Sequence, residues 1–483
     1  MPYKDLRSFV GKLEEQGEVK RIQGAHWDQE IGVVSELSFE RGGPALLFER
    51  ISGYPAEYRL LVNLCSTLKR SLLAIDMPAD LSTGEAMERW REFYRSYQPV
   101  PPVKVASAEF HENVLEGSDV DLLRFPVPKW HEKDGGRYIG TGCMEILRDP
   151  ESGKVNVGTY RLMVHDRNTT GMYQGPSNDG MRMVRKYWAQ GKSCPIAVTL
   201  GEEPVIFLSS CGRLGCPSGV PEYEFAGAIR KEPVEIVEGE LTGLPIPASA
   251  EIVLEGTIPP PEVERKGEGP FGEYTGYYMG GTVPQPVVKV NRIYYRNDPI
   301  LLGAPPFKPV SGHYASPLPF RLVTGLWSRL EKAGIQGIQA VRDLVNVGGV
   351  VVSIRQQDED HVNRVMAALD KSPIQQRLLV LVDDDVDIDD PREVLWAMGT
   401  RMDPASGTKV STIETDWVFN PMLSIEQRTD KPSYPFSRLI VNACRPYRRL
   451  RDFPPVNLFS DERRKAAWSK WRMDEWLKER EKA

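Results

Sequence analysis

Apolar positions near the start of the chain recur with the period of a helix. One face of segment 1–22 carries the apolar residues, and charged residues take the other face. The apolar residues are Leu6, Phe9, Val10 and Leu13. The segment predicts an amphipathic helix and not a signal peptide. A membrane span requires about 18 consecutive apolar residues, and no apolar run in the sequence is that long. We expect a cytoplasmic protein with no membrane partner.

The middle of the chain shows the patterns of strands. Between about residues 111 and 310, short alternating or β-branched runs are separated by Gly and Pro, with few helical stretches. Examples are VNVGTYRLMV, PIAVTL, AEIVLEGTI and QPVVKVNRIYY. They predict a β-rich, barrel-like domain. The proline-rich stretch SYQPVPPVKV before it is not expected to form regular structure and indicates a domain boundary near residue 110.

After about residue 320, helical and strand patterns alternate. The order is FRLVTGLWSRLEKAG (helix), GGVVVSI (strand), DEDHVNRVMAALD (helix), RLLVLV (strand) and PREVLWAMG (helix). Asp390 is placed to cap the last helix, with Pro391 at its first position. This alternation predicts an α/β domain. The predicted domains are therefore 1–110, 111–315 and 316–483.

The charged tail SDERRKAAWSKWRMDEWLKEREKA is predicted to form a terminal helix. Three tryptophans in it require a covering surface: Trp468, Trp471 and Trp476. A neighbouring subunit or the tail's own domain can provide that surface. The sequence leaves both alternatives open.

Composition narrows the class of ligand. The chain has 483 residues, of which 41% are hydrophobic and 27% charged, as in a globular protein with two or three domains. A net charge of -6 disfavours nucleic acids and anionic membranes as partners. The six cysteines are scattered without the spacing of a zinc site, which favours reduced, buried thiols. We expect a small-molecule ligand.

The stretch GEGPFGEYTGYY carries two glutamates, Glu268 and Glu273. Pro270 has no amide donor, and Gly269 and Gly272 permit backbone angles that other residues avoid. A shaped loop followed by an aromatic strand is therefore predicted. Such a loop either positions the two carboxylates for function or forms a solvated acidic turn, and these residues alone leave both interpretations open.

Asn156 and Arg161 lie five positions apart in NVGTYR, which has the pattern of a strand. Strict alternation places them on opposite faces, so either Gly158 marks a bulge or the two residues serve different pockets. A buried arginine requires an acidic partner, which Glu268 or Glu273 can supply. The alternative is an exposed strand arginine with no functional role.

Two further segments are acidic. In GVPEYEFAGAIR, Glu222 falls in the first turn of a helix entered through Pro221. There it either complements the helix dipole or serves as an oxygen ligand for a hard cation. The run LVDDDVDIDD favours a strand-end loop and helix cap over a metal cluster. The sequence contains no phosphate-loop, dinucleotide-binding or Gly-x-Ser-x-Gly motif.

Taken in order, NVGTYR, PEYEFAGAIR, EGPFGEYTGYY, VDDDVDIDD and WAMGTRMDP resemble the UbiD family of decarboxylases, which use prenylated flavin mononucleotide (FMN). The likeness extends over essentially the whole chain, from DLRSFVGKLEEQGEV through DLLRFPVPKWHEKDGGRYIGTG to FSRLIVNACRP. It implies a multidomain α+β fold. The N-terminal domain would be α/β, the central domain a cofactor-binding split β-barrel similar to flavin reductases, and the C-terminal domain an α/β domain that mediates dimers or hexamers.

By this resemblance, the family's catalytic set falls on Arg161, Glu268 and Glu273. The implied mechanism needs the cofactor because no ordinary side chain accepts the electrons that remain when carbon dioxide leaves an unsaturated acid. Arg161 would orient the carboxylate, Glu268 would pair with Arg161, and Glu273 would deliver a proton. To deliver that proton, Glu273 requires a raised pKa, which burial beside the aromatic rings of the loop would produce.

The resemblance also implies a metal and cofactor site. A divalent metal, usually Mn²⁺, would bridge the cofactor phosphate to Asn156 and Glu222, with K⁺ nearby. Asn178 stands where many members have a histidine ligand; an amide oxygen can still bind manganese, but the softer imidazole is lost. Further cofactor contacts fall on Gly158, Thr159 and, near the phosphate, Arg377.

The predicted activity is therefore reversible, non-oxidative decarboxylation of an unsaturated, aromatic or heteroaromatic acid. A flavin prenyltransferase would supply the cofactor, and the chain would form a homodimer or homohexamer. Two other hypotheses stay open. The chain could be a flavin reductase, against which the complete catalytic set argues, or a cofactor-binding or scaffold subunit of a multi-component carboxylase, which Asn178 modestly favours.

Overall fold

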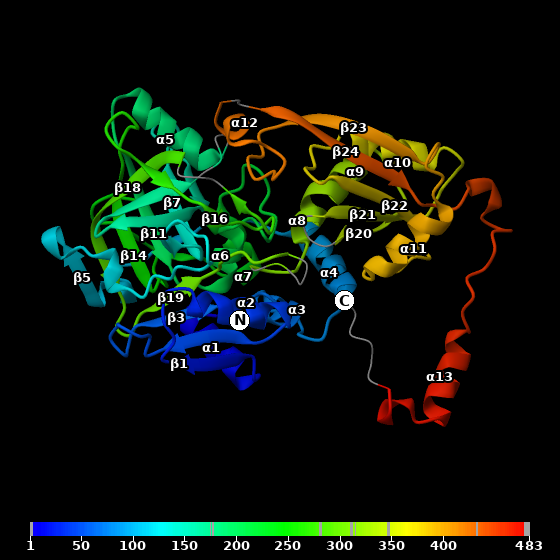
Figure 1. Cartoon of the computed structure of the whole chain (residues 1–483), viewed down its shortest axis with the longest axis horizontal. Helices are drawn as coiled ribbons and strands as arrows, with labels where there is room; N and C mark the ends of the chain where they lie inside the picture. Colours follow the sequence, from blue (N-terminus) through cyan, green and yellow to red (C-terminus); the bar gives the residue numbers. More distant parts are fainter. Residues whose placement is uncertain are drawn as a thin grey trace. The chain divides into compact units, whose positions relative to one another are not determined.

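The computed structural model describes residues 3–173, 175, 178–279, 283–309, 313, 315–344, 348–430 and 433–477. It shows a multidomain α+β chain (Figure 1) that divides into two compact units. The first unit contains Met1–Gly325 and Glu414–Phe436. The second contains Leu326–Leu344, Gly348–Ile413 and Ser437–Ala483. The division into three domains stays a prediction.

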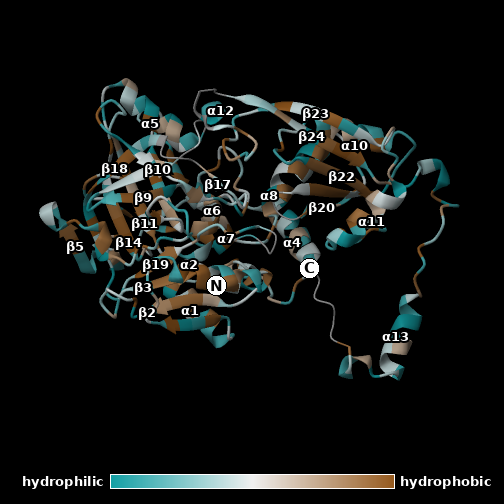
Figure 2. Cartoon of the chain, in the orientation of Figure 1, coloured by the Kyte–Doolittle hydropathy of each residue, from teal (hydrophilic) through white to brown (hydrophobic). Residues whose placement is uncertain are grey.

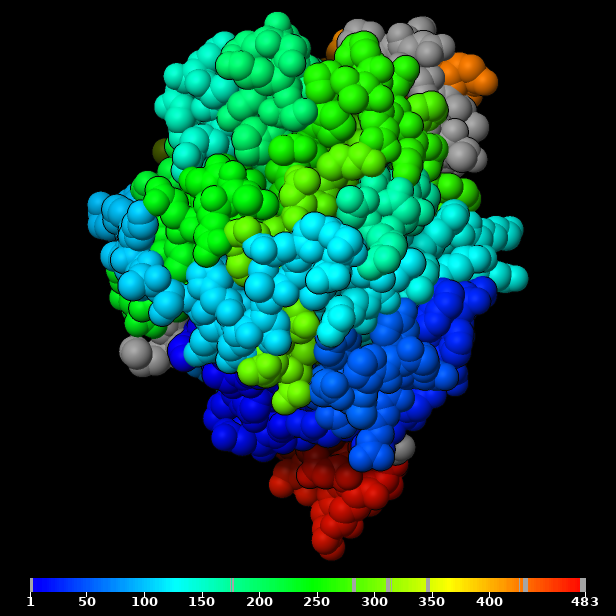
Figure 3. Space-filling model, turned by 90° about the vertical axis from the view of Figure 1, so that its left-hand side faces the viewer, coloured from blue at the N-terminus to red at the C-terminus, as the bar shows by residue number. Residues whose placement is uncertain are grey.

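The N-terminal part of the first unit is a four-stranded sheet with flanking helices. Its strand order is β1-β2-β3-β19. The elements are α1 (Leu6–Glu15), β1 (Val19–Gln23), α2 (Glu30–Glu40), β2 (Ala45–Glu49), β3 (Arg59–Val62), α3 (Leu68–Ala74), α4 (Thr83–Ser96) and β19 (Ile300–Gly303). Helix α1 begins at Asp5, whose side chain accepts a hydrogen bond from the Ser8 amide, and it buries the four predicted apolar residues. Strand β19 comes from much later in the chain than its partner β3. Early and middle segments of the chain therefore lie side by side and share one continuous surface (Figure 3).

The largest sheet of the first unit has ten strands and curls into a half-barrel (Figure 1). Its main path is β6-β9-β10-β18-β14-β11-β7-β8, and β5 and β15 also pair with β18. The strands are β5 (Asn113–Glu116), β6 (Arg137–Gly140), β7 (Cys143–Arg148), β8 (Val155–Gly158), β9 (Arg161–Asp166), β10 (Thr169–Tyr173), β11 (Cys194–Leu200), β14 (Ile252–Ile258), β15 (Arg265–Glu268) and β18 (Val283–Tyr295). The prediction of a β-rich middle segment is confirmed.

Shorter elements complete the first unit. The helices are α5 (Asp179–Ala189), α6 (Pro204–Ser210), α7 (Glu222–Arg230), α8 (Phe320–Leu322) and α12 (Ile425–Asp430), with 3₁₀ turns at Glu109–Glu112, Gly117–Asp119 and Leu122–Arg124. The small sheets are β13-β12-β4 (Pro245–Pro247, Glu235–Glu238, Val103–Lys104) and β16-β17 (Phe271–Gly272, Tyr278–Met279). The expectation that SYQPVPPVKV contains no regular structure is wrong at its end, because β4 pairs in parallel with β12.

The core of the first unit joins the two larger sheets. Buried residues of the N-terminal sheet, such as Leu46 and Leu60, pack in one cluster with residues of the half-barrel, such as Leu162, Leu254 and Ile293. Figure 2 shows these strands as the hydrophobic interior of the unit. Apolar burial on this scale is the main stabilising contribution to folding, and it supplies a rigid support for polar groups at the sheet edges.

The second unit has an α/β arrangement of elements. Its five-stranded sheet has the order β20-β21-β22-β24-β23. The elements are α9 (Ser328–Lys332), β20 (Ile338–Leu344), β21 (Gly349–Ile354), α10 (His361–Asp370), β22 (Leu378–Asp383), α11 (Pro391–Arg401), β23 (Thr408–Thr415) and β24 (Tyr434–Asn442). A π-helical turn, Val323–Trp327, lies between α8 and α9, so the predicted first helix is present with an irregular centre. Asp390 caps α11 by accepting from the Arg392 amide, which confirms that prediction.

The tail forms a shorter helix than predicted. Helix α13 spans Asp461–Lys470, and a 3₁₀ turn at Met473–Glu475 follows. Arg472 between them has a left-handed backbone conformation, which ends the helix. Trp471 and Trp476 are both 64% exposed, so the described part of the chain does not cover them. A 3₁₀ turn at Tyr447–Arg449 precedes α13.

Bilayer crossing by a helix needs both length and apolar character. None of the described helices combines the two.

Candidate active site

Asn156 and Arg161 lie on two different strands. Strand β8 ends at Gly158, and Arg161 opens β9. Strand β8 pairs with β7, whereas β9 pairs with β6 and β10. The interpretation of NVGTYR as one continuous strand is therefore wrong, because the chain leaves the sheet between the two residues. Neither a bulge nor strand alternation is needed to separate them.

The guanidinium of Arg161 binds both predicted glutamates. Its Nε and Nη2 donate to the two carboxylate oxygens of Glu268 at 2.8 and 2.5 Å, and its Nη1 donates to Oε1 of Glu273 at 2.5 Å. All three side chains are buried, and Glu268 is only 1% exposed. The predicted acidic partners of Arg161 are thus both present. Two carboxylates surround one guanidinium, so the cluster has more acidic than basic groups.

Aromatic rings enclose this cluster. The ring centroids of Tyr173 and Phe271 lie 4.0 and 5.1 Å from the guanidinium carbon of Arg161, within cation–π distance. Tyr138 packs on Phe271 with centroids 4.3 Å apart. Such rings keep water away from the charged groups, which strengthens the electrostatic interactions among them.

The cluster shifts the proton affinity of its members. Burial raises the pKa of Glu273, and the charge of Glu268 adds to the rise, while Arg161 opposes it. Burial alone would lower the pKa of Arg161, but the two carboxylates together raise it, so Arg161 stays charged. Glu273 therefore holds a proton at higher pH than a solvated glutamate does.

A second loop, residues 131–136, holds the loop that carries the two glutamates. The Gly135 amide donates to the Pro270 carbonyl at 2.7 Å, and the Gly272 amide donates to Asp134 at 3.0 Å. A Cβ atom on Gly135 would lie 2.0 Å from the Gly269 carbonyl oxygen, so only glycine fits there. These residues were not predicted, although the adjacent glycines in KDGGRY are a signal of a close backbone approach.

An aromatic wall lies next to the cluster. Trp417 Nε1 donates to the Tyr274 hydroxyl at 2.6 Å. The Phe419 ring centroid lies 5.7 Å from that of Tyr173 and 5.4 Å from that of Tyr274. All four rings are half-buried, and all belong to the first unit. We define Tyr173, Tyr274, Trp417 and Phe419 as the aromatic wall; its two members from DWVFNPML were not predicted from the sequence.

Asn156 and Glu222 form a second polar region. Asn156 is buried, and its Nδ2 has no hydrogen-bond partner among the described residues. Glu222 is the first residue of α7, and it accepts a hydrogen bond from the Val157 amide at 3.3 Å. Burial raises the pKa of Glu222. A buried amide without a partner next to a desolvated carboxylate suits a bound metal ion or phosphate, so these residues fit the group that the sequence predicts.

Asn178 lies immediately before α5 and makes no side-chain capping bond. Its amide donates to the Gly175 carbonyl at 3.2 Å. The next residue, Asp179, adds to the raised pKa of Glu222, which is due first to burial. The role of Asn178 as a metal ligand stays a prediction.

The other predicted cofactor contacts have structural roles of their own. A Cβ on Gly158 would lie 2.6 Å from the Tyr160 hydroxyl, and the Thr159 hydroxyl donates to a carbonyl of β7 at 3.0 Å. Arg377 belongs to the second unit, where it is exposed and donates to the Ser437 carbonyl at 2.9 Å. Their contacts with a cofactor stay predictions.

The run of aspartates is a structural feature. Asp383 and Asp385 pair with Arg401 and Arg445, and Asp390 caps α11. In the part of the chain that the structure describes, no three His, Cys, Asp or Glu residues are grouped so that they could hold a metal ion. The interpretation as a strand-end loop and helix cap is confirmed.

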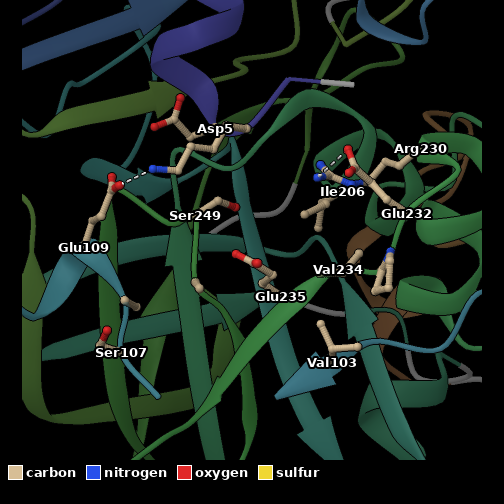
Figure 4. A pocket seen from close by; sticks show the side chains of 14 residues that line it. Asp5, Val103, Ser107, Glu109, Ile206, Arg230, Glu232, Val234, Glu235 and Ser249 are labelled. Carbon is tan, nitrogen blue, oxygen red and sulfur yellow. Dashed lines mark hydrogen bonds and ion pairs between the residues drawn. The ribbon is translucent and has the colours of Figure 1, made fainter. Parts of the chain in front are cut away.

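A polar cavity of about 640 Å³ opens elsewhere in the first unit (Figure 4). Both cationic residues in its lining have partners: Lys4 pairs with Glu109 at 2.5 Å, and Arg230 pairs with Glu203 at 3.0 Å. None of its lining residues belongs to the Arg161 cluster or to the Asn156 region. The cavity therefore does not change the assignment of the site.

Comparison with known families decides the class of this site. Three domain models of 3-octaprenyl-4-hydroxybenzoate carboxy-lyase match the chain in order. They are the UbiD N-terminal domain at residues 10–90, the Rift-related domain at 102–309 and the C-terminal domain at 324–427. An uncharacterised protein of Archaeoglobus fulgidus is 33% identical over 84% of this chain and 85% of its own length. The chain belongs to the UbiD family.

Other UbiD relatives have named activities. A phenolic acid decarboxylase of Bacillus subtilis is 32% identical over 84% of this chain and 86% of its own length. The UbiD-class enzyme HmfF of Pelotomaculum thermopropionicum, solved with FMN, superposes with a TM-score of 0.81 at 26% identity, covering 98% of this chain and 100% of that one. Vanillic acid decarboxylase of Sedimentibacter hydroxybenzoicus, in its open form, gives 0.79 at 27% identity with the same coverage.

These findings confirm the predicted family and reaction class. The chain is a UbiD-class carboxy-lyase. They do not favour a flavin reductase or a scaffold subunit.

Proposed function

We propose that this enzyme uses prenylated FMN to decarboxylate an aromatic or heteroaromatic acid reversibly, with Arg161, Glu268 and Glu273 as its catalytic residues. The observation that carries the proposal is the buried Arg161, bound by both oxygens of Glu268 and by one oxygen of Glu273. A solved relative contains prenylated FMN, which supports the cofactor. The aromatic wall supports a flat, unsaturated substrate.

The three side chains have different duties in this proposal. Arg161 keeps N–H groups beyond those bound to the glutamates and uses them to orient the substrate carboxylate. Glu268 fixes the guanidinium through two parallel bonds. Glu273, with its raised pKa, donates the proton to the carbon that carbon dioxide leaves.

We assign the cofactor site to the Asn156 region. Bound prenylated flavin would supply the electron sink that the loss of carbon dioxide requires. Asn156 and Glu222 would hold its phosphate through Mn²⁺ or another divalent metal, with Asn178 as a further ligand and K⁺ alongside. The unpartnered Nδ2 of Asn156 supports a phosphate at this site, because an amide N–H donates to a phosphate oxygen. Remaining cofactor contacts within the first unit are assigned to Gly158 and Thr159.

The proposal extends to domain organisation and assembly. The N-terminal domain, 1–110, would be α/β; the central domain, 111–315, a flavin-reductase-like split barrel; and the C-terminal domain, 316–483, an α/β domain that mediates a homodimer or homohexamer. The exposed tryptophans of the tail support a subunit contact. A flavin prenyltransferase would supply the cofactor.

Production of the protein with and without a flavin prenyltransferase tests the function. We expect the co-produced protein to contain a modified flavin and divalent metal, and to release carbon dioxide from aromatic acids in a substrate screen. Protein from cells that lack any prenyltransferase should release none. Full activity in that second sample would contradict the proposal.

A further inference from the structure

Two buried polar side chains of β7 lie against the connection between β8 and β9, and the proposed mechanism leaves both without a role. Cys143 and Glu145 are each 0% exposed. The Tyr160 amide donates to Oε2 of Glu145 at 2.8 Å. The Sγ of Cys143 lies 3.2 Å from Oε1 of Glu145 and 3.2 Å from the Tyr160 carbonyl oxygen. Both backbone polar groups of Tyr160 therefore bind side chains of β7.

Tyr160 connects the two halves of the proposed site. It lies in neither β8 nor β9, so no strand ladder pairs its backbone. Its peptide continues directly into Arg161, while its hydroxyl lies beside Asn156 and near the backbone of Gly180. A shift of the Tyr160 backbone would therefore move Arg161 away from its glutamates.

The hydrogen bonds among Cys143, Glu145 and the Tyr160 backbone depend on how many protons the two side chains carry. The thiol has a single proton but two oxygen atoms at bonding distance. We call the set of bonds closed when each of these contacts is a hydrogen bond. A closed set needs a second proton, which a neutral Glu145 supplies. Its O–H then donates to Sγ, the thiol donates to the Tyr160 carbonyl, and the Tyr160 amide donates to the carboxyl group.

The surroundings of Glu145 favour this neutral form. Burial raises the pKa of Glu145 to about 8, and it raises the pKa of Cys143 well above its usual value. Cys143 and Tyr160 are the titratable residues that contact Glu145 among the described residues. Val198 of β11 and Gly158 of β8 face Glu145 in the sheet, and α6, which packs on β7, contains only Pro, aliphatic, Phe and Ser residues. Helix α5 also packs on β7 and carries Arg182, Arg185 and Lys186, of which Arg182 pairs with Asp179 and Lys186 with Asp149.

We propose that Glu145 and Cys143 are positioning residues that fix the orientation of Arg161 through the backbone of Tyr160. The inference rests on the proposed role of Arg161. Neither side chain touches the Arg161 cluster directly, so their effect passes through the peptide that precedes Arg161.

Two substitutions of Glu145 separate this role from general packing. Glu145→Gln keeps an acceptor for the Tyr160 amide and a donor for Sγ, so the set of bonds survives and kcat at pH 7 should be retained. Glu145→Leu leaves the Tyr160 amide unpaired and should lower kcat about 10- to 100-fold, because misplacing a catalytic group by about 1 Å has effects of that size. Crystal structures of both variants should show Arg161 displaced only in Glu145→Leu.

The dependence on pH gives a readout that packing alone would not change. Above a pH of about 8, the wild-type enzyme loses the proton that closes the set of bonds, so its kcat should decline there. Glu145→Gln cannot ionise and should lack the part of this decline that Glu145 causes, whereas the loss of activity caused by deprotonation of Glu273 should remain. An equal loss of kcat in Glu145→Gln and Glu145→Leu at pH 7, or identical pH profiles of wild type and Glu145→Gln, would overturn the proposal.

Thermal unfolding keeps this test separate from the proposed function. The folded chain retains the Glu145 proton between about pH 4.5 and 8, whereas the unfolded chain loses it, so this residue makes stability fall as pH rises through that window. The difference in Tm between Glu145→Gln and wild type should therefore grow in favour of Glu145→Gln across it. A constant difference would contradict the neutral Glu145, whereas an inactive wild-type enzyme would contradict only the proposed function.

Discussion

At the scale of single residues, the two glutamates differ in how they bind Arg161. Glu268 uses both carboxylate oxygens and is fixed by two parallel bonds. Glu273 gives only one oxygen to the guanidinium, while its second accepts a long bond from the Tyr274 amide at 3.3 Å. A carboxyl group bound on one side can exchange a proton without releasing the arginine. This difference in bonding supports Glu273 as the acid.

Glu273→Gln should keep the shape of the site and remove its proton. Turnover should fall by about 100-fold or more, the contribution of a general acid, while substrate and cofactor still bind. The measurement is single-turnover carbon dioxide release combined with incorporation of solvent deuterium into the product. We expect the first carbon dioxide to leave and the labelled product to fail to appear. Loss of carbon dioxide release itself would show that the roles of Glu273 and Glu268 are wrongly assigned.

Glu268→Gln should lower the pKa of Glu273, although Glu268 itself does not donate the proton. Burial is the main reason for the raised pKa of Glu273, but the charge of Glu268 contributes and Arg161 opposes it. Without that charge, Glu273 becomes the sole acidic partner of Arg161 and its pKa falls, so the alkaline limb of the kcat profile should move to lower pH. Glu264→Gln, which removes a carboxylate paired with Lys289, is the control and should leave the limb unchanged. An unmoved limb in Glu268→Gln would argue against coupling.

The pairing of Glu268 with Arg161 was expected from the family resemblance, but the geometry of the bonds could not be predicted from the sequence. Arg161 and Glu268 are 107 positions apart, so their geometry depends on how β9 and β15 are brought together by the sheet. Glu145 was not predicted at all. It lies in a strand pattern where a glutamate usually faces solvent, and only the missing ladder at Tyr160 explains why it is buried.

At the scale of elements, local sequence patterns were sufficient to predict an element when its formation depends on its own residues. Helix α10 follows from its apolar periodicity, and α1 and α11 also have capping residues at their starts. The break between β8 and β9 and the entry of β19 into the N-terminal sheet depend on distant partners, so periodicity could not reveal them. The loop of the two glutamates was predicted as a shaped loop, but the 131–136 loop that holds it was not.

Gly135→Ala tests how strongly that second loop supports the site. The new methyl group would meet the Gly269 carbonyl oxygen at 2.0 Å, so the loop with the two glutamates must move. We expect kcat to fall about 10- to 100-fold together with a lower Tm. The matched control is Gly11→Ala in α1, where nothing lies within 4 Å and alanine should stabilise the helix by up to about 1 kcal/mol. Normal kcat in Gly135→Ala would show that the contact is dispensable.

The segment after β23 is expected to act on substrate selection through the aromatic wall. Trp417→Phe keeps a ring but removes the donor to the Tyr274 hydroxyl, and Tyr274→Phe removes the acceptor. Each should lower kcat/KM for an aromatic acid by about 2- to 10-fold, in line with about 0.5–1.5 kcal/mol for one hydrogen bond. The double variant should be no worse than either single variant. Additive losses would show that the two residues act independently.

At the scale of the whole molecule, the chain combines a first unit that contains all three proposed catalytic residues with a second α/β unit. The first unit is not continuous in sequence, because Glu414–Phe436 returns to it and supplies half of the aromatic wall. Composition and charge alone predicted a globular protein with a small ligand, whereas the division into units required the structure. The assembly of subunits also belongs to this scale, and substitutions in the tail can test it.

Substitution of the tail tryptophans should weaken the proposed assembly. Trp471 and Trp476 are both 64% exposed, an unfavourable arrangement for large aromatic side chains unless another subunit covers them. The double variant Trp471→Ala/Trp476→Ala should therefore sediment at a lower mass than wild type at the same concentration, with an unchanged Tm for the individual chain. Tyr277→Ala, which removes an exposed ring of the first unit, is the control and should keep the wild-type mass. If the double variant and wild type sediment alike over a wide range of concentration, the tail does not form the subunit contact and the assembly must use another surface.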